Sequence, residues 1–220
     1  MRMTRAAIVL AGGDPVEPGI KRFLPGGADV IAADSGVHNA AVLGLHVDRI
    51  VGDLDSADPA AVHDARVRGA TIEVHPVDKD ATDLELALAA AQSRGAAHIL
   101  VVGGAGGRLD HFLANVAVIA APRFAGVEID AIFGDAQVAV VQGGRPPHAV
   151  RGVPGSIVTL LPIGGDARGI TTTGLEYPLD DEDLPAGTTR GVSNLLVGER
   201  ATVELARGTL LVVQPEGGAR

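Results

Sequence analysis

The segment HILVVGGAGGRLDH, residues 98–111, contains the pattern that decides the fold. Its first five residues are mostly apolar and β-branched, which is typical of a buried strand. Glycines then dominate residues 103–107, and an apolar pattern with helical spacing follows at 112–120. A buried strand, a glycine-rich turn and a helix, in this order, form the repeating unit of a parallel α/β sheet.

The same alternation extends through the first 133 residues. Short β-type runs predict strands at 6–11, 28–33, 49–51, 71–74, 98–102 and 127–133. Ala-rich stretches with helical spacing predict helices at 37–43, 60–67, 84–92 and 112–120. We therefore expect an α/β domain over residues 1–142, with a mostly parallel sheet and helices on both of its faces.

The pattern changes after about residue 143. Strands are predicted at 156–161, 169–173, 201–205 and 209–213, separated by Gly, Pro and Asp turns and without a convincing helix. Residues 142–154, rich in Gly, Pro and Arg, are predicted to be a linker. The expected second domain, residues 143–220, is an all-β, sandwich-like domain.

The composition excludes several classes of protein. With 46% hydrophobic and 20% charged residues, the chain of 220 residues can bury a core and is not disordered. A net charge of −9 and an aromatic content of 2% disfavour binding to nucleic acid or to anionic membranes. The chain has no cysteine, so disulfides and thiolate chemistry are excluded. Residues 6–11 are too short for a signal peptide core, and we expect a cytoplasmic protein.

Acidic residues concentrate in one stretch of the chain. Residues 48–85 contain ten acidic and four basic residues. Within it, Asp53 and Asp55 lie two residues apart, so their carboxylates would project to one side of an extended segment and repel each other. A hard divalent cation such as Mg²⁺ relieves this repulsion. The alternative is an Asp-rich turn whose side chains bond to their own backbone.

The next loop adds further carboxylates. Asp78, Asp80 and Asp83 surround Lys79 just before the predicted helix at 84–92. Either Asp80 or Asp83 could cap that helix, and Thr82 with Glu85 forms a capping box. Because three acids exceed what a cap requires, we expect at least one of them to face the metal or the substrate.

Residues 103–111 indicate a phosphate site. Glycines let backbone N–H groups approach an oxyanion, a helix N-terminus favours negative charge, and Arg108 can fork onto phosphate oxygens. The segment matches neither GxGxxG nor GxxxxGK[ST], and glycine-rich turns are common, so this signal alone is weak. Two further motifs can be explained without a ligand. ADSG at 33–36 can be a helix N-cap, and GVSN at 191–194 can be a turn before a strand.

Taken together, the motifs resemble those of the thiamine pyrophosphokinase (thiamine diphosphokinase) family. The matching segments in the first domain are ADSG (33–36), VGDLDS (51–56), KDATDLE (79–85) and GRLDH (107–111). GLEYPL (174–179) and GVSN (191–194) are similar to motifs of the family's second domain. The resemblance extends from about Ile8 to Val213, and several motifs in the same order are far more specific than any single one.

The resemblance implies a fold, a reaction and an assembly. The fold is an N-terminal α/β/α domain followed by a C-terminal β-sandwich. The reaction converts ATP and thiamine to AMP and thiamine diphosphate, with Mg²⁺. The assembly is a homodimer whose active sites lie in clefts between subunits.

The resemblance also implies a role for each matching residue. Metal binding is expected at Asp53, Asp55 and Asp80, and catalysis at Asp55, Asp80 and Asp83. ATP is expected against Asp34, Ser35, Gly36, Lys79, Gly107, Arg108, Asp110 and His111. Ser193 and Asn194 are expected to approach thiamine. The chain has no Trp, whereas some members of the family stack an aromatic side chain on the thiamine rings.

Two other functions are compatible with these residues. The first is another Mg²⁺-dependent pyrophosphokinase, or a nucleotide hydrolase, acting on a different alcohol or on water. The second is a non-catalytic nucleotide-binding module. The clustered carboxylates disfavour the second, because charges of one sign held together without a cation destabilise the fold.

Overall fold

The computed structural model describes residues 5–216, so the outermost residues of both expected domains, 1–4 and 217–220, lie outside the described part. The chain forms two compact units. The first comprises Met1–Val118 and Gly126–Gly134, and the second comprises Ile119–Ala125 and Asp135–Arg220. No helix between residues 5 and 216 is long and apolar enough to cross a bilayer.

A parallel sheet forms the centre of the first unit, as the sequence predicts. Its strands lie in the order β6-β5-β1-β2-β3-β4, and each neighbouring pair is parallel. Their bounds are β1 (Ala6–Leu10), β2 (Asp29–Ala33), β3 (Arg49–Gly52), β4 (Thr71–Val74), β5 (His98–Val102) and β6 (Glu128–Phe133). From β1 the chain adds β2, β3 and β4 on one side, and it then crosses back to place β5 and β6 on the other side of β1. This reversal opens a crevice beyond the carboxyl ends of β1 and β5.

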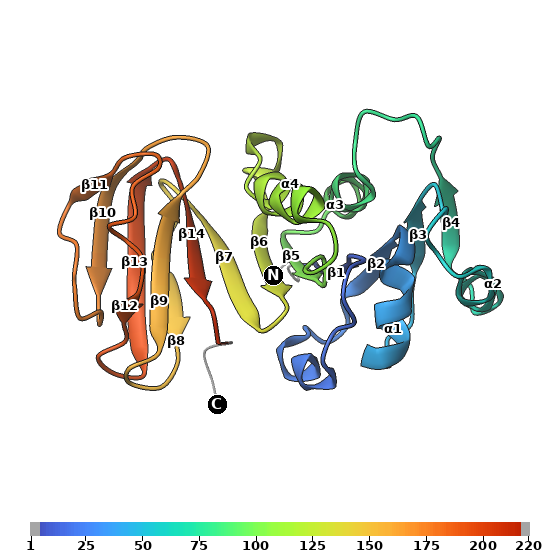
Figure 1. Ribbon diagram of the computed structural model, residues 1–220, viewed down its shortest axis with the longest axis horizontal. Coiled ribbons are helices and arrows are strands. Elements are labelled where there is room, and N and C mark those ends of the chain that lie inside the picture. The colour runs from blue at the N-terminus through green and yellow to red at the C-terminus, as the bar shows by residue number, and fades with distance from the viewer. Residues whose placement is uncertain (1–4, 217–220) are drawn as a thin grey trace. The chain divides into compact units, whose positions relative to one another are not determined.

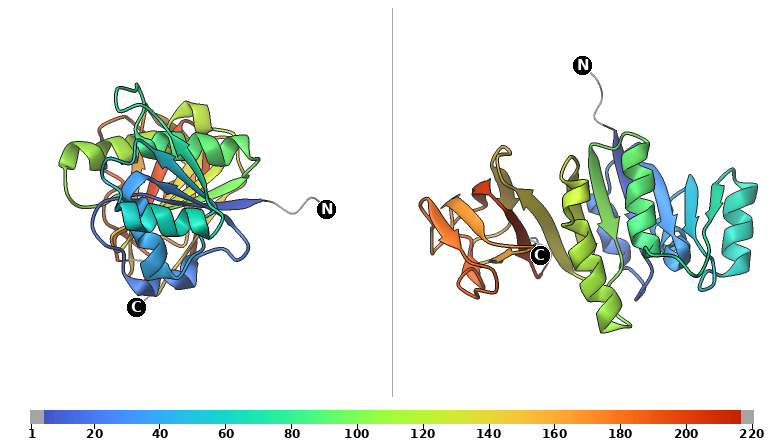
Figure 2. Two further views of the ribbon diagram at one scale, coloured as in Figure 1. Left: turned by 90° about the vertical axis from the view of Figure 1, so that its right-hand side faces the viewer. Right: turned by 90° about the horizontal axis from the view of Figure 1, so that it is seen from above.

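Helices cover both faces of this sheet, which confirms the expected α/β class. The helices are α1 (Val37–Leu43), α2 (Pro59–Val67), α3 (Asp83–Ser93) and α4 (Leu109–Ile119), with 3-10 turns η1 (Pro18–Phe23) and η2 (Asp34–Gly36). Figures 1 and 2 show α3 and α4 on one side of the strands and α1 and α2 on the other. Alternate strand residues pack against the two layers: Ile8 and Leu10 join α1 and η1 in one core, whereas the opposite face meets α3, which buries Leu84 and Leu88.

The second unit contains two antiparallel sheets, in the orders β12-β9-β14-β7 and β11-β10-β13-β8 (Figure 1). The strands are β7 (Ala136–Gln142), β8 (His148–Arg151), β9 (Ile157–Pro162), β10 (Ala167–Thr173), β11 (Glu182–Leu184), β12 (Asn194–Leu195), β13 (Arg200–Arg207) and β14 (Thr209–Gln214). The unit also contains the 3-10 turn η3 (Pro122–Phe124). One apolar core is filled from both sheets, by Leu160 and Val212 of the first and Ile170 and Val203 of the second. The unit is therefore a β-sandwich, as expected.

Two details differ from the sequence prediction. Residues 142–154 are not a free linker, because His148–Arg151 form β8 and pair with β13. The strand Ala136–Gln142, which the sequence analysis did not identify and which lies within residues 1–142, pairs along its length with β14 of the second unit. Both differences arise because the paired residues of the partner strands are 49 to 77 residues apart in the sequence.

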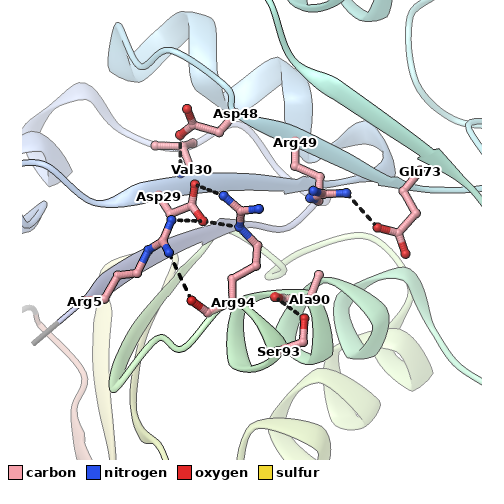
Figure 3. Close-up of polar contacts among 9 residues, drawn as sticks. All are labelled: Arg5, Asp29, Val30, Asp48, Arg49, Glu73, Ala90, Ser93 and Arg94. Carbon is pink, nitrogen blue, oxygen red and sulfur yellow. Dashed lines mark hydrogen bonds and ion pairs between the residues drawn. The ribbon is translucent and has the colours of Figure 1, made fainter.

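Ion pairs tie the amino edge of the parallel sheet together (Figure 3). Asp29, at the start of β2, accepts two bonds from Arg94, at 2.5 and 3.3 Å, and lies 3.6 Å from the Arg5 guanidinium. Arg49 donates to Glu73 across β3 and β4 at 3.0 Å. These ion pairs link β2, β3 and β4 with residues from the start of β1 and the end of α3.

His98 makes folding sensitive to pH at this amino edge. Its Nε2 lies 2.9 Å from the Asp130 carboxylate on β6, and this hydrogen bond raises the pKa of His98 above 6.5. The stabilisation is fully present below pH 6.5 and is lost as the pH rises through the raised pKa. We expect the melting temperature of the Asp130→Asn variant to change less between pH 6 and pH 9 than that of the unmodified chain. An identical pH profile for both proteins would contradict this role for the pair.

Candidate active site

A cavity of about 710 Å³ lies in the first unit, beyond the carboxyl ends of the parallel strands. The loops that follow β1, β2, β3, β4 and β5 all contribute to its lining. Among the residues that the sequence predicts as functional, the cavity is lined by Asp34, Ser35, Asp53, Asp55, Lys79, Asp83, Gly107, Arg108 and His111. Gly36, Asp80 and Asp110 are absent from the part of the lining that the structure describes.

Three carboxylates meet in this cavity. Asp34, Asp53 and Asp55 each present an oxygen, and these oxygens lie within 4.8 Å of one another. The neighbouring strands β2 and β3 run in register, with Ala33 beside Val51, so the residues that follow them are brought together. The sequence predicts Asp53 and Asp55 as a pair, but it places Asp34 against ATP, and only the sheet shows that Asp34 joins them.

Asp34 is the most constrained of the three. Its side chain is buried, its backbone lies in the left-handed region at φ 46°, and its Oδ1 has no hydrogen-bond partner. Burial raises the pKa of Asp34, and the nearby charges of Asp83, Asp53 and Asp55 raise it further. A buried, unpartnered carboxylate oxygen in a strained segment is costly, and a bound cation would offset that cost. The donor set of three carboxylates suits Mg²⁺.

Lys79 links the two acidic loops. Its ammonium lies 2.5 Å from Asp53 Oδ2 and 3.0 Å from Asp83 Oδ1, and its side chain is largely buried. The hydrogen bond from Lys79 lowers the pKa of Asp53. Burial opposes the charge on Lys79, but the hydrogen bonds that Lys79 donates to the two carboxylates outweigh it and raise the pKa of Lys79. Lys79 therefore offsets part of the negative charge that Asp53 and Asp83 bring to the cavity.

The loop that contains Lys79 divides its acids between two tasks. Thr82, not an aspartate, caps α3 by accepting the Glu85 N–H at 3.3 Å, so the capping box predicted from the sequence supplies the cap. Asp83 begins the helix and faces the cavity. Asp80 is exposed, so its proposed metal and catalytic roles have no support from the cavity lining.

The glycine-rich loops bring backbone close to backbone. Gly104 N–H donates to Gly12 O at 2.6 Å, and Asp14 N–H donates to Ala105 O at 2.9 Å. In the loop after β5, the backbone has positive φ at Gly103, Gly104, Gly106 and Gly107. Residues other than glycine rarely adopt this conformation. Arg108 follows this loop, is exposed, and forks onto Asp110. Asp110 thus orients Arg108 and does not itself line the cavity, and this ion pair lowers the pKa of Asp110 to about 2.

Two asparagines hold these loops, and the sequence analysis did not identify them. Asn39 of α1 is buried and donates to Ala11 O at 2.8 Å. Asn115 of α4 donates to Gly104 O at 2.9 Å and lines the cavity. Each is a polar residue in a mostly apolar helix, and that is the only signal in the sequence that could have revealed them.

Ser193 and Asn194 lie in the second unit. Ser193 has a left-handed backbone at φ 61° and is exposed, and its N–H donates to Thr159 Oγ1 at 3.0 Å. Asn194 is buried, and its side chain bonds to the backbone of Tyr177. The resemblance assigns both residues to thiamine binding, but in the structure Ser193 is exposed whereas Asn194 is buried.

Comparison with known proteins assigns both units. Residues 23–131 match the family model "Thiamin pyrophosphokinase, catalytic domain", and residues 148–210 match "Thiamin pyrophosphokinase, vitamin B1 binding domain". The chain belongs to the thiamine pyrophosphokinase family. Members of this family transfer the pyrophosphoryl group of ATP to thiamine.

Individual relatives agree with this family assignment. The chain is 27% identical over 184 residues to thiamine pyrophosphokinase from Bacillus subtilis, covering 84% of this chain and 86% of the relative. It is 29% identical over 173 residues to thiamine pyrophosphokinase 1 from Oryza sativa subsp. japonica, covering 75% of this chain and 64% of that longer relative.

Solved structures of thiamine pyrophosphokinases share the fold. The Bacillus subtilis crystal structure superposes with a TM-score of 0.82 at 23% identity, covering 96% of this chain and 98% of that one. A family protein from Enterococcus faecalis gives a TM-score of 0.75 at 27% identity, with coverage of 96% and 98%.

In this thiamine pyrophosphokinase family member, Gly36 has a packing role. A Cβ added at Gly36 would lie 2.0 Å from the carbonyl oxygen of Leu10, a buried backbone atom that cannot move aside. We expect Gly36→Ala to lower the free energy of unfolding by about 1–3 kcal/mol, as measured by urea denaturation. Gly126→Ala is the matched control, because a Cβ there meets nothing within 4 Å, and its effect should stay within about 0.5 kcal/mol. Equal stability of the two variants would contradict this packing role.

Proposed function

We propose that this chain transfers the pyrophosphoryl group of ATP to the hydroxyl group of thiamine, giving thiamine diphosphate and AMP, at the cavity of the first unit. The observation that carries the proposal is the convergence of Asp34, Asp53 and Asp55 in a cavity bordered by glycine-rich loops. Family membership supports the same reaction.

Magnesium is proposed at the three clustered carboxylates. Asp53 and Asp55 are the ligands that the sequence predicts, and Asp34 joins them because its oxygen is buried without a partner. When bound, Mg²⁺ neutralises the triphosphate and polarises its phosphoryl oxygens. From the loop after β4, we assign Asp83 and Lys79 to the site on their position in the cavity. A role for Asp80 stays a prediction from the resemblance.

ATP is proposed along the loops after β2 and β5. Ser35, Gly107, Arg108 and His111 line the cavity there. Backbone N–H groups of a glycine loop and an Arg fork hold phosphate oxygens, while Asp110 orients Arg108. Gly36 serves the close approach of η2 to β1 and does not line the cavity.

Pyrophosphoryl transfer depends on how the protein positions its substrates more than on a covalent bond between protein and substrate. Pyrophosphoryl transfer requires an alcohol in line with the β-phosphorus and neutralisation of charge on the phosphates. An ionised aspartate of the cavity can accept the hydroxyl proton. Asp55 is one of the three catalytic aspartates that the resemblance implies, with Asp80 and Asp83, and it is exposed and lines the cavity.

The reaction and the role of Asp55 are tested together. Incubation with ATP, Mg²⁺ and thiamine should release AMP and thiamine diphosphate in equal amounts. Asp55→Asn should lower kcat by roughly a hundredfold or more, because it removes a charge from the metal site. Asp64→Asn, at an exposed position of α2, is the matched control and should retain full activity.

Each contrary result has a distinct meaning. AMP without thiamine diphosphate would assign a different alcohol, or water, as the acceptor. ATP binding that is equal with and without a chelator, and without turnover, would indicate a non-catalytic nucleotide-binding module. Full kcat and unchanged Mg²⁺ dependence in Asp55→Asn would remove Asp55 from the site.

We also propose that the chain forms a homodimer and works in the cytoplasm, where ATP is available. Support for self-association comes from α4, where Leu109, Leu113 and Ala117 lie one turn apart and are exposed. Leu109 and Leu113 are 70% and 58% exposed, which is unfavourable for an isolated chain.

Leu113→Asp tests this surface. We expect it to weaken dimer formation by roughly tenfold or more in sedimentation velocity, because a carboxylate would be buried at the interface. Val67→Asp, at a 72% exposed position of α2, should leave the dimer intact. A dimeric Leu113→Asp variant would exclude this face of α4, and an unmodified chain that is monomeric at all concentrations would contradict the homodimer.

A further inference from the structure

Two segments of the second unit pair in antiparallel fashion through backbone hydrogen bonds. Residues 174–178 lie beside residues 194–197: Glu176 N–H donates to Leu195 O at 2.9 Å, and Val197 N–H donates to Gly174 O at 3.0 Å. Leu175 and Leu196 form the bridge between them. Backbone bonds of this kind do not extend to Tyr177.

The side chain of Asn194 takes the place of backbone hydrogen bonds at the next position along the two segments, Tyr177. Asn194 Oδ1 accepts the Tyr177 N–H at 3.0 Å, and Asn194 Nδ2 donates to Tyr177 O at 2.7 Å. The preceding residue, Ser193, has a left-handed backbone, so the chain turns away from the 174–178 segment at this point. The amide thus pairs with both backbone groups of Tyr177, as a strand residue would.

Asn194 has little capacity left for a ligand. Its Oδ1 also accepts the Leu195 N–H at 2.9 Å, so both oxygen lone pairs and one of its two N–H groups are used. Only 7% of the residue is exposed. For a direct contact with thiamine, the role that the resemblance implies, this buried amide has only its second Nδ2 N–H left.

The segments that Asn194 joins present apolar side chains to solvent. Tyr177 and Val197, one on each segment, are each 64% exposed. Leu175 and Leu196, on the same two segments, are buried in the core of the sandwich. The two paired segments therefore have one face in the core and one face exposed to solvent. Both segments lie within residues 148–210, which match the vitamin B1 binding model of the family.

We propose that Asn194 is a positioning residue for thiamine binding, which acts by fixing the 174–178 segment and its exposed Tyr177, and that it does not bind thiamine itself. The proposal rests on the proposed function for its link to thiamine. The two hydrogen bonds between the Asn194 side chain and the Tyr177 backbone, which we call the clamp, do not depend on the proposed function.

The single tyrosine allows a direct test. The chain has one Tyr and no Trp, so the intrinsic fluorescence reports Tyr177 alone. In the substrate-free protein, Asn194→Ala and Asn194→Asp should both lower the time-resolved anisotropy of this fluorescence, because the backbone of Tyr177 is released. Asn194→Asp keeps the oxygen acceptor but loses the donor to Tyr177 O, so its effect should be the smaller.

Kinetics test the link to thiamine. Both variants should raise the KM for thiamine by about tenfold while the KM for ATP stays within about twofold, since the loss is confined to the positioning of one segment. Gln214→Glu is the matched control. Gln214 is another buried amide of the second unit, it donates to Arg151 O at 2.9 Å, and its loss should leave the Tyr177 anisotropy and the thiamine KM unchanged.

The outcomes separate the alternatives. Unchanged anisotropy with a raised thiamine KM would make Asn194 a thiamine ligand and overturn the proposal. Lowered anisotropy with an unchanged thiamine KM would overturn the link to binding, and no change in either would overturn the clamp. If the unmodified chain does not form thiamine diphosphate, the proposed function fails, and the anisotropy still decides whether Asn194 holds Tyr177.

Discussion

The repulsion between three aspartates at one edge of a parallel sheet is the constraint on which the first unit depends. Asp34, Asp53 and Asp55 come within 4.8 Å because β2 and β3 are neighbouring parallel strands whose carboxyl ends coincide. The buried sheet core fixes both strands and so holds the backbone segments that carry these carboxylates close together. Lys79 compensates the charge of Asp53 and Asp83, while the buried oxygen of Asp34 stays unpartnered. The fold thus stores an electrostatic cost at the place where a bound cation would relieve it.

Small residues and side-chain amides shape the rest of the cavity. The loops after β1 and β5 meet through backbone hydrogen bonds, which require glycine where the chains approach closely. Asn39 and Asn115 hold the carbonyls of Ala11 and Gly104 from two different helices. The glycine-rich loops that line the cavity are thus kept in place by hydrogen bonds within the chain, which preorganises them before any ligand binds.

The second unit uses the same device in a different fold. Its sandwich core is apolar and shared by both sheets. At its surface, Asn194 substitutes a side-chain amide for a strand and so orders a segment that contains the chain's one tyrosine. In both units, asparagine side chains hold the backbone of loops or irregular segments in place.

The sequence by itself determined the α/β and β-sandwich classes, most strand and helix positions and the acidic pair Asp53 and Asp55, because hydrophobic periodicity, glycine turns and short charge spacings are local properties. Local patterns could not reveal β7 and β8, whose identity as strands depends on partners far along the chain. They could not show that Asp34 joins the carboxylate cluster, that Asp83 and not Asp80 faces the cavity, or that Asn194 bonds to Tyr177. The tertiary structure decided these points, since strand order and helix placement set which side chains from distant segments meet.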